Sequence, residues 1–307
     1  MAANGISNLS TKQAKQVAKL NLAQYKRQGY TLNADGSVAS GPDTTKNFYR
    51  INNTYTITEL PESYSGNTSV NNGNGANLIQ GRPWKQLIVT SGLQLFLDAA
   101  SQLSYPGTGT TWYDLSGNHN DLTMQNASNI NYTNINGGYF TLTSNGYFDR
   151  ATTTGVPTGS SPYCLSVWIN THPNWGNLGF VGIGNDFTTD HVNEFRGDSL
   201  ANLKNYWWSN DFTHSFNVSG TDPNNTYWLN LVAQWDGTTR SLWANGVQQG
   251  TQASSGLNVD NSYVQVGRTK TNEYLDGQIG QVLIYNRALT STEIQQNFNV
   301  IKTRYGF

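Results

Sequence analysis

The sequence contains little charge and almost no cysteine. Only 12% of its 307 residues are Asp, Glu, Lys or Arg, and the formal net charge is −1. This balance gives no electrostatic reason for binding to nucleic acid. The single cysteine, Cys164, excludes an intramolecular disulfide, and its apolar neighbours in YCLSVWI favour a buried, unreactive thiol.

Long apolar runs are missing as well. No stretch of 18 consecutive apolar residues occurs, so we expect no helix that spans a membrane. The first residues, MAANGISNLSTKQ, also lack the apolar segment of a secretory signal. We therefore expect synthesis in the cytoplasm and no membrane insertion.

The sequence also lacks the motifs of common catalytic and cofactor sites. Its four histidines form no H-x-H or H-x-x-x-H pair that would suit zinc. No Gly-x-Ser-x-Gly element, phosphate-binding loop or dinucleotide fingerprint is present. We therefore expect that the protein requires no cofactor.

Turn-forming residues, in contrast, are abundant. The chain has 31 glycines and many Asn and Thr residues, a composition typical of β proteins. From residue 88 onward, short β-rich runs alternate with Gly, Asn and Asp turns, which predicts a two-sheet antiparallel sandwich. The predicted strands are LQLFLD, GYFTLT, YCLSVWI, LGFVGIG, NYWW, YWLNLVAQWD, RSLWANG, YVQVG and GQVLIYN.

Two local patterns in this part of the chain predict particular structures, a hairpin and a short helix. In residues 228–246, alternate positions should face the core on both sides of a hairpin turn at Asp236-Gly237. The residues expected to face inward are Leu229, Leu231, Ala233, Leu242 and Ala244. Near the end, Thr290 and Glu293 form a capping box that predicts a short helix at about 291–303.

The N-terminal arm, residues 1–85, has a different character. Residues 10–28 predict its one helix, which opens with a capping box of Ser10 and Gln13. This helix carries five positive charges and no acid: Lys12, Lys15, Lys19, Lys26 and Arg27. The charges form either a solvated helix face or a surface that docks on an acidic partner. Residues 30–85 are too polar to bury a core of their own.

Three segments of the C-terminal part resemble the successive signatures of laminin-G-like, concanavalin A-like jelly-roll domains. They are GLQLFLDAASQLSYPGTGTTWYDLSGNHNDLTM, YWLNLVAQWDGTTRSLWANGVQQG and YVQVGRTKTNEYLDGQIGQVLIYNRALTSTEI. The resemblance covers about residues 88–307 and implies a mainly β, antiparallel jelly-roll sandwich that ends in the short helix. Residues 1–85 are then an extended N-terminal arm that contains one helix.

The N-terminal arm resembles a different group of proteins. Its stretches SNLSTKQAKQVAKLNLAQYKRQGY, FYRINNTYTITELPESYSGN and IQGRPW are similar to the leader of virion structural proteins from phages of cyanobacteria. This implies a bacteriophage virion structural protein, either a capsid decoration or a neck or tail accessory, that displays a lectin-like domain. Its partners would be other virion proteins, and a homo-oligomer would follow the particle symmetry. The alternative is a host-recognition adhesin that binds cell-surface polysaccharide.

Glucanases share the concanavalin A-like fold and carry their catalytic carboxylates on one strand as Glu-x-Asp-x-Glu. None of the five glutamates stands in that pattern. The nearest approach, Asp190, Glu194 and Asp198, would place neighbouring carboxylates about 13 Å apart along a strand. A retaining hydrolase needs a separation of about 5 Å. We therefore expect no enzymatic activity.

Aromatic residues beside amides and carboxylates are candidates for sugar binding, because sugar rings stack on aromatic faces while hydroxyls form hydrogen bonds. The candidates are Trp175, Tyr206, Trp208, Asn210 and Asp211. If 204–209 is a strand, Tyr206 and Trp208 share one face and Trp207 points to the other. One face should pack in the core, so at most one of the two should bind a ligand. Core packing is the alternative role for each tryptophan.

Calcium is the one metal that the sequence favours. The loop YDLSGNHND offers four residues with oxygen ligands suited to a hard cation: Asp114, Asn118, Asn120 and Asp121. Their spacing is not that of an EF-hand. The alternative is that these side chains form Asx turns, which stabilise the loop through its own backbone.

Overall fold

A computed structural model describes residues 88–134, 138–171, 177–184, 188–198, 202–215, 227–269 and 272–307. It also describes four short strands in the N-terminal arm. β1 (Thr31–Leu32) pairs with β2 (Val38–Ser40), and β3 (Phe48–Ile51) pairs with β4 (Thr56–Glu59). The predicted helix at 10–28 lies outside the described residues. The chain divides into two compact units, the first mostly within residues 1–82 and the second mostly within residues 83–307.

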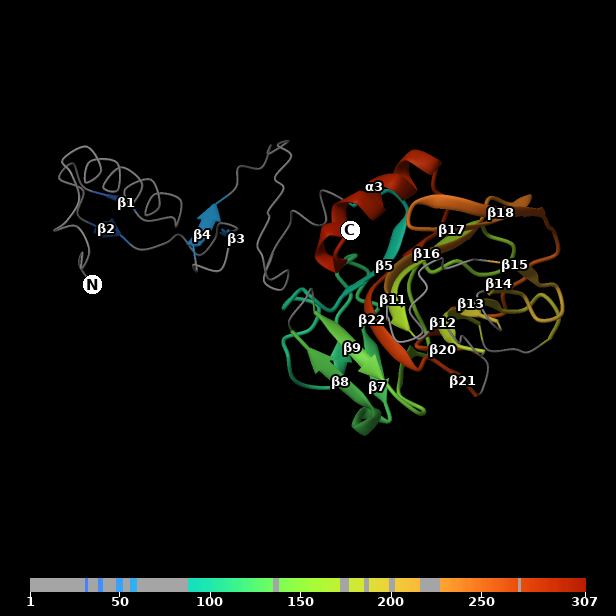
Figure 1. Ribbon diagram of the computed structural model, residues 1–307, viewed down its shortest axis with the longest axis horizontal. Coiled ribbons are helices and arrows are strands. Elements are labelled where there is room, and N and C mark those ends of the chain that lie inside the picture. The colour runs from blue at the N-terminus through green and yellow to red at the C-terminus, as the bar shows by residue number, and fades with distance from the viewer. Residues whose placement is uncertain are drawn as a thin grey trace. The chain divides into compact units, whose positions relative to one another are not determined.

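The larger unit is built on two antiparallel sheets (Figure 1). The β6–β15 sheet contains, in spatial order, β15 (Phe212–Ser215), β14 (Asn202–Tyr206), β13 (Asn193–Gly197), β12 (Gly179–Ile183), β19 (Val264–Val266), β10 (Tyr147–Arg150), β7 (Leu122–Gln125) and β6 (Thr111–Trp112). The β8–β18 sheet contains β18 (Val247–Ala253), β17 (Thr239–Ala244), β16 (Tyr227–Trp235), β11 (Tyr163–Thr171), β22 (Gly277–Tyr285), β9 (Tyr139–Leu142) and β8 (Ile130–Thr133), with β5 (Leu93–Asp98) paired to β22. A small hairpin of β20 (Arg268–Thr269) and β21 (Glu273–Tyr274) follows β19.

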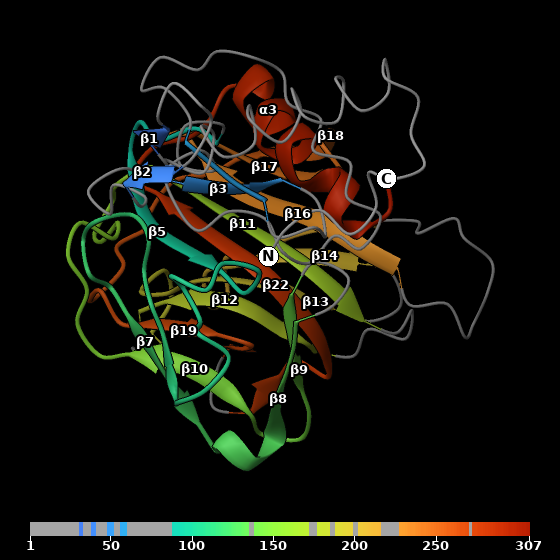
Figure 2. The same ribbon diagram turned by 90° about the vertical axis from the view of Figure 1, so that its left-hand side faces the viewer.

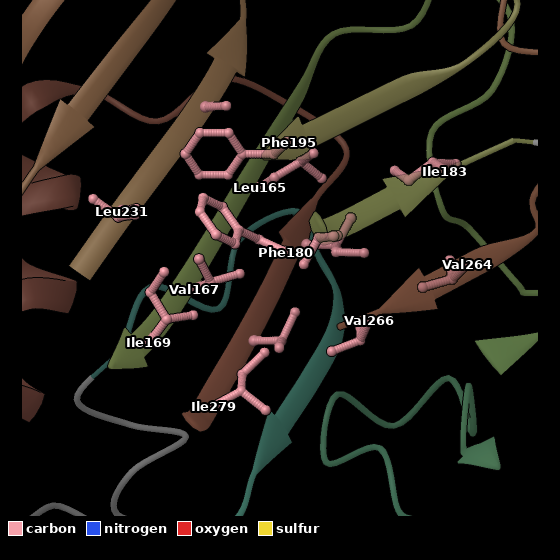
Figure 3. Packing of buried hydrophobic residues seen from close by; sticks show 14 of the residues in the cluster. Leu165, Val167, Ile169, Phe180, Ile183, Phe195, Leu231, Val264, Val266 and Ile279 are labelled. Atoms are coloured by element: carbon pink, nitrogen blue, oxygen red, sulfur yellow. The ribbon is translucent and has the colours of Figure 1, made fainter. Parts of the chain in front are cut away.

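Strand alternation places one face of each sheet in a shared core. Leu165, Val167 and Ile169 of β11 are fully buried and point toward β12, β13 and β19 of the other sheet (Figure 3). The residues predicted to face inward from the 228–246 hairpin are all in this core cluster, which confirms that prediction. Asp236 stabilises the turn, because its carboxylate accepts hydrogen bonds from the Thr238 and Thr239 backbone. The predicted mainly β antiparallel sandwich is therefore present.

Helix α3 (Ser291–Ile301) covers the outer face of the β8–β18 sheet (Figure 2). The predicted capping box is confirmed: the Thr290 hydroxyl accepts from the Glu293 backbone, and the Glu293 carboxylate accepts from the Thr290 backbone. Phe298 of the helix stacks on Trp168 of β11 at a centroid distance of 5.7 Å. A 3-10 turn, Lys302–Tyr305, extends this cover. The outer face of the β6–β15 sheet is therefore on the opposite side of the sandwich from α3.

The described part of the chain contains no helix with the length and apolar character needed to cross a membrane. Cys164 is buried, as predicted, and burial raises the pKa of its thiol.

Candidate functional site

Several strand connections meet at one end of the sandwich, here called the loop end. The loop after β6 contacts the loop after β10, since the Asn120 amide donates to the Thr154 carbonyl at 2.9 Å. The loop after β10 is bridged in turn to the loop after β18, between Gly159 and Val259. The Asp260 backbone of that last loop donates to the His191 carbonyl of the loop after β12. These contacts hold four separate connections in one group.

An open cleft of about 690 Å³ lies at the loop end. Its lining consists of hydroxyl, amide and carboxylate groups together with small apolar residues and prolines. The lining residues are Thr153, Gly155, Val156, Pro157, Thr158, Ser161, Pro162, Asp260, Asn261, Ser262 and Asn286. This volume is in the range of small-molecule sites. The cleft can therefore offer hydrogen-bond donors, acceptors and flat C–H surfaces to a polar ligand.

Two walls of the cleft are joined before any ligand binds. Thr153 donates from its backbone to the Ser262 hydroxyl and from its own hydroxyl to the Ser262 carbonyl, at 3.1 and 2.7 Å. Gly155 also suits this wall, because its φ of +74° is a backbone angle that residues with a side chain rarely adopt. The cleft is therefore a preformed feature of the fold.

The four residues predicted for calcium lie together beside this cleft, but their side chains are used within the protein. The Asp114 carboxylate accepts from the Phe96, Ser116 and Asn120 backbones at 2.8 to 3.0 Å. Asp121 accepts from the Asp114 backbone at 2.8 Å. Asn118 donates to the Gln94 carbonyl, and Asn120 bonds reciprocally with Thr154. These are the loop-stabilising contacts of the alternative interpretation.

Within the described ranges, no three His, Cys, Asp or Glu side chains are grouped so that they could hold a metal. Calcium binding at this loop stays a prediction. A shift of the melting temperature on chelation would be its signature.

The aromatic cluster at 206–208 separates into a core residue and two outer residues. Trp207 is fully buried, and its Nε1 donates to the Tyr163 hydroxyl at 3.0 Å. Tyr206 is only 7% exposed, because the Arg196 guanidinium lies 4.5 Å from its ring centroid. Trp208 is half-buried and meets Tyr206 edge-on at 5.7 Å. Trp207 is therefore the buried core residue, and Tyr206 offers almost no open ring face for stacking.

The predicted strand over this cluster is too long. β14 ends at Tyr206, because Trp208 and Ser209 adopt left-handed backbone angles with φ of 50° and 68°. Such angles cannot continue a β ladder. Trp208 therefore belongs to the loop end and not to the sheet.

The polar neighbours in this cluster also have internal partners. The Asn210 amide donates to the Asp190 carboxylate at 2.8 Å, and its oxygen accepts from Arg240. The Asp211 carboxylate pairs with Lys204 at 3.5 Å. Trp175 lies outside the described residues, as do the five basic residues predicted for anchoring. Sugar binding at Tyr206, Trp208, Asn210 and Asp211 stays a prediction.

Arg240 holds the loop after β14 in place, and this role was not predicted from the sequence. Its side chain is fully buried, and its guanidinium lies 4.0 Å from the Trp207 ring. It donates to the Asn205 and Asn210 carbonyls and to the Gln252 side chain. Burial lowers the pKa of the Arg240 guanidinium from its ordinary value. The strand alternation was the available signal, because Arg240 is two residues before the inward-facing Leu242.

The three carboxylates weighed for catalysis have separate surroundings. Asp190 bonds to Asn210, and Asp198 pairs with Lys204 at 2.8 Å. Glu194 is fully buried on β13. The absence of enzymatic activity stays a prediction.

Comparison with known proteins identifies the domain. Residues 143–295 match the family model of the concanavalin A-like lectin/glucanases superfamily. This segment is a concanavalin A-like lectin/glucanase domain. No curated protein sequence matches the chain. The concanavalin A-like prediction is thereby confirmed for residues 143–295, whereas the similarity of the arm to phage leaders stays a prediction.

Solved structures agree with the domain's fold at low sequence identity. The binding domain of Paraclostridial Mosquitocidal Protein 1 is 16% identical with a TM-score of 0.51, over 68% of this chain and 52% of that chain. Botulinum neurotoxin type C, whose cell entry depends on interaction with two ganglioside molecules, is 13% identical with a TM-score of 0.53, over 71% and 53%. Domain 4 of the arabinanase AbnA from Geobacillus stearothermophilus, in complex with arabinotriose, is 14% identical with a TM-score of 0.51, over 67% and 98%. The chain thus spans about half the length of the toxin structures, and these likenesses concern the fold.

Proposed function

We propose that the concanavalin A-like domain is a lectin-like binding module that holds a saccharide in the cleft at the loop end. The observation that carries this proposal is an open, preformed cleft of about 690 Å³ with a polar lining. A saccharide presents many hydroxyl groups, and each needs a hydrogen-bond partner when it leaves water. The AbnA domain, solved with arabinotriose, supports a carbohydrate ligand by analogy of fold.

The cleft lining suits such a ligand for two reasons. Asp260 and Thr158 place a carboxylate and a hydroxyl at the same opening, so acceptors and a donor are present together. Pro162, which is partly exposed, adds a rigid C–H surface against which the apolar face of a sugar ring can pack. The hydrogen bonds between Thr153 and Ser262 already order two walls of the cleft. Ligand binding therefore costs less conformational entropy.

A glycan array followed by titration of the best ligand tests this function. We expect Asp260→Ala and Thr158→Val each to weaken binding about three- to tenfold, which corresponds to about 1 kcal/mol per lost hydrogen bond. Thr143→Val is the matched control, because Thr143 lies outside the cleft lining. Unchanged affinity in both cleft variants would refute the cleft as the site. Loss of binding in Trp175→Ala alone would move the site to that residue.

We infer further that the chain is a bacteriophage virion structural protein, a capsid decoration or a neck or tail accessory. Its support is the similarity of the arm to phage leaders and the five basic residues of the predicted helix at 10–28. In this setting, residues 1–85 anchor the chain to other virion proteins and the lectin-like domain faces outward. The host-recognition adhesin is the second candidate, and a saccharide in the cleft would favour it.

Particle assembly distinguishes anchoring from adhesion. Residues 1–85 should be required for incorporation of the chain into particles, and Lys12→Glu with Lys15→Glu and Lys19→Glu should reduce it. Incorporation of a chain without residues 1–85 would contradict the anchor. If the protein is an adhesin, particles that carry Asp260→Ala should still assemble but should adsorb to host cells more slowly.

A further inference from the structure

The outer face of the β6–β15 sheet carries a cluster that the cleft does not include. Phe148 of β10 and Val266 of β19 are paired and fully buried, so their strand neighbours point away from the core. These neighbours include Tyr147, Asp149 and Gln265. None of them lines the cleft at the loop end. The face therefore offers a separate surface.

Arg268 is the centre of this cluster. Its Nε donates to the Gln265 side chain at 2.8 Å, and its Nη2 donates to the Tyr263 hydroxyl at 3.1 Å. The guanidinium carbon lies 4.0 Å from the centroid of the Tyr147 ring, and Tyr274 is 6.0 Å from Tyr147 between ring centroids. These contacts fix the guanidinium before binding, which reduces the entropy that a ligand must overcome.

Among the described residues, Arg268, like Arg150 and Arg240, lacks the direct carboxylate partner that neutralises the other arginines of the domain. Arg196, Arg287 and Arg304 each pair directly with a carboxylate. Arg268 reaches a carboxylate only through the Tyr263 hydroxyl, which donates to Asp149 at 2.6 Å. The other Asp149 oxygen accepts from Gln125 at 2.9 Å. Within the described part of the chain, Arg268 thus presents a guanidinium with no direct carboxylate partner.

Gln265 beneath the guanidinium is buried, but the other side chains of the cluster are only half-buried. Tyr147, Tyr274 and Arg268 itself each keep part of their surface open to solvent. A guanidinium binds planar or tetrahedral anions through parallel N–H groups, and neighbouring tyrosine rings can pack against a sugar ring. This combination fits a saccharide that carries a negative charge better than a neutral one.

We propose that this face binds the anionic group of an acidic saccharide, a uronate carboxylate or a sulfate ester, at Arg268. The anion lies on the guanidinium, and the sugar ring packs against Tyr274, because the guanidinium already covers a face of the Tyr147 ring. The inference rests on the proposed saccharide-binding function but uses a second surface, so the two can fail separately. The negative charge of Asp149 repels the bound anion. Removing that charge should therefore strengthen binding, whereas removing the Arg268 charge should weaken it.

The experiment uses the full chain with three polymers: polygalacturonate for the carboxylate, dextran sulfate for the sulfate ester, and neutral dextran. We expect Arg268→Gln to weaken binding of the acidic polymers about tenfold or more, because hydrogen bonds to charged groups are the stronger ones. Asp149→Asn should strengthen that binding about two- to threefold, since it removes the opposing charge. The polymer whose affinity falls in Arg268→Gln identifies carboxylate or sulfate as the anion.

Two controls keep the result specific. The first control is Arg150→Gln, which also removes one positive charge from the domain but at a different position, on β10. Arg150 donates to the Thr152 and Asp121 carbonyls, so this variant should leave the affinity for acidic polymers unchanged. Arg268→Lys keeps the charge but loses the planar fork, and should fall between the natural chain and Arg268→Gln. Melting temperatures of all variants confirm folding.

Several outcomes would overturn the inference. They are absence of acidic-polymer binding, affinity unchanged in both Arg268 variants, or weaker binding in Asp149→Asn. Acidic-polymer binding that is lost in Asp260→Ala but kept in Arg268→Gln would leave the cleft as the site. That outcome would preserve the proposed function and remove this inference.

Discussion

At the scale of the residue, Trp207 and Trp208 differ sharply although they are adjacent. Trp207 is fully buried, donates to Tyr163 and lies under Arg240, whereas Trp208 is half-buried beside the loop end. We expect Trp207→Ala to lower the free energy of unfolding by about 3–5 kcal/mol, because it leaves a large cavity and removes a hydrogen bond. Trp208→Ala is the matched control and should lower it by about 1 kcal/mol or less. Urea denaturation of both variants measures the difference, and equal losses would contradict the assigned burial.

At the scale of the element, helix α3 should make the protein sensitive to acid. Hydrogen bonds from Arg287 lower the pKa of Glu293 from its usual 4.5 to about 2. A carboxyl whose folded pKa is depressed stabilises the fold above its unfolded pKa, and this contribution disappears as the pH falls from about 4.5 to about 2. The Glu293 side chain is 25% exposed, so solvent screening limits the contribution to about 1 kcal/mol.

Glu293→Gln tests this acid sensitivity. The variant should be less stable than the natural chain by about 1 kcal/mol at pH 7, and the difference should vanish near pH 2. Urea midpoints at pH 7, 4 and 2.5 follow the change. Arg287→Gln should remove the same pH-dependent difference, because it removes the partner that lowers the pKa. A Glu293→Gln difference that is constant with pH would exclude the ion pair as its source.

At the scale of the whole molecule, features were predictable when the interacting residues are close together in the sequence. The strand at Leu93–Asp98 and the capping box of α3 follow from patterns within a few residues, and both are present. The cleft was not predicted, because its walls are joined by Thr153 and Ser262, 109 residues apart. Strand β13 was also missed, because Glu194 and Arg196 make a sheet strand look like a polar loop.

The same long-range contacts predict where the folded domain begins. Of the residues whose burial the structure describes, the first in the core is Ile88, and the Val89 backbone donates to Asn297 and accepts from Tyr285. A chain of residues 86–307 should therefore unfold in one cooperative transition within a few degrees of the full chain. A chain that begins at residue 93 loses the burial of Ile88 and Val89, both hydrogen bonds of Val89, and the Ser91 and Gly92 carbonyls that accept from Arg287 and Asn286. It should be less stable by about 4 kcal/mol or more.

Thermal and urea unfolding of these two truncated chains form a matched pair, since they differ by only seven residues. Equal stability of the two chains would show that residues 86–92 contribute little to the fold. An insoluble or non-cooperative 86–307 chain would show that the domain needs residues 1–85 to fold. In that case the loss of particle incorporation on deleting residues 1–85 would report misfolding and could no longer be taken as a test of anchoring.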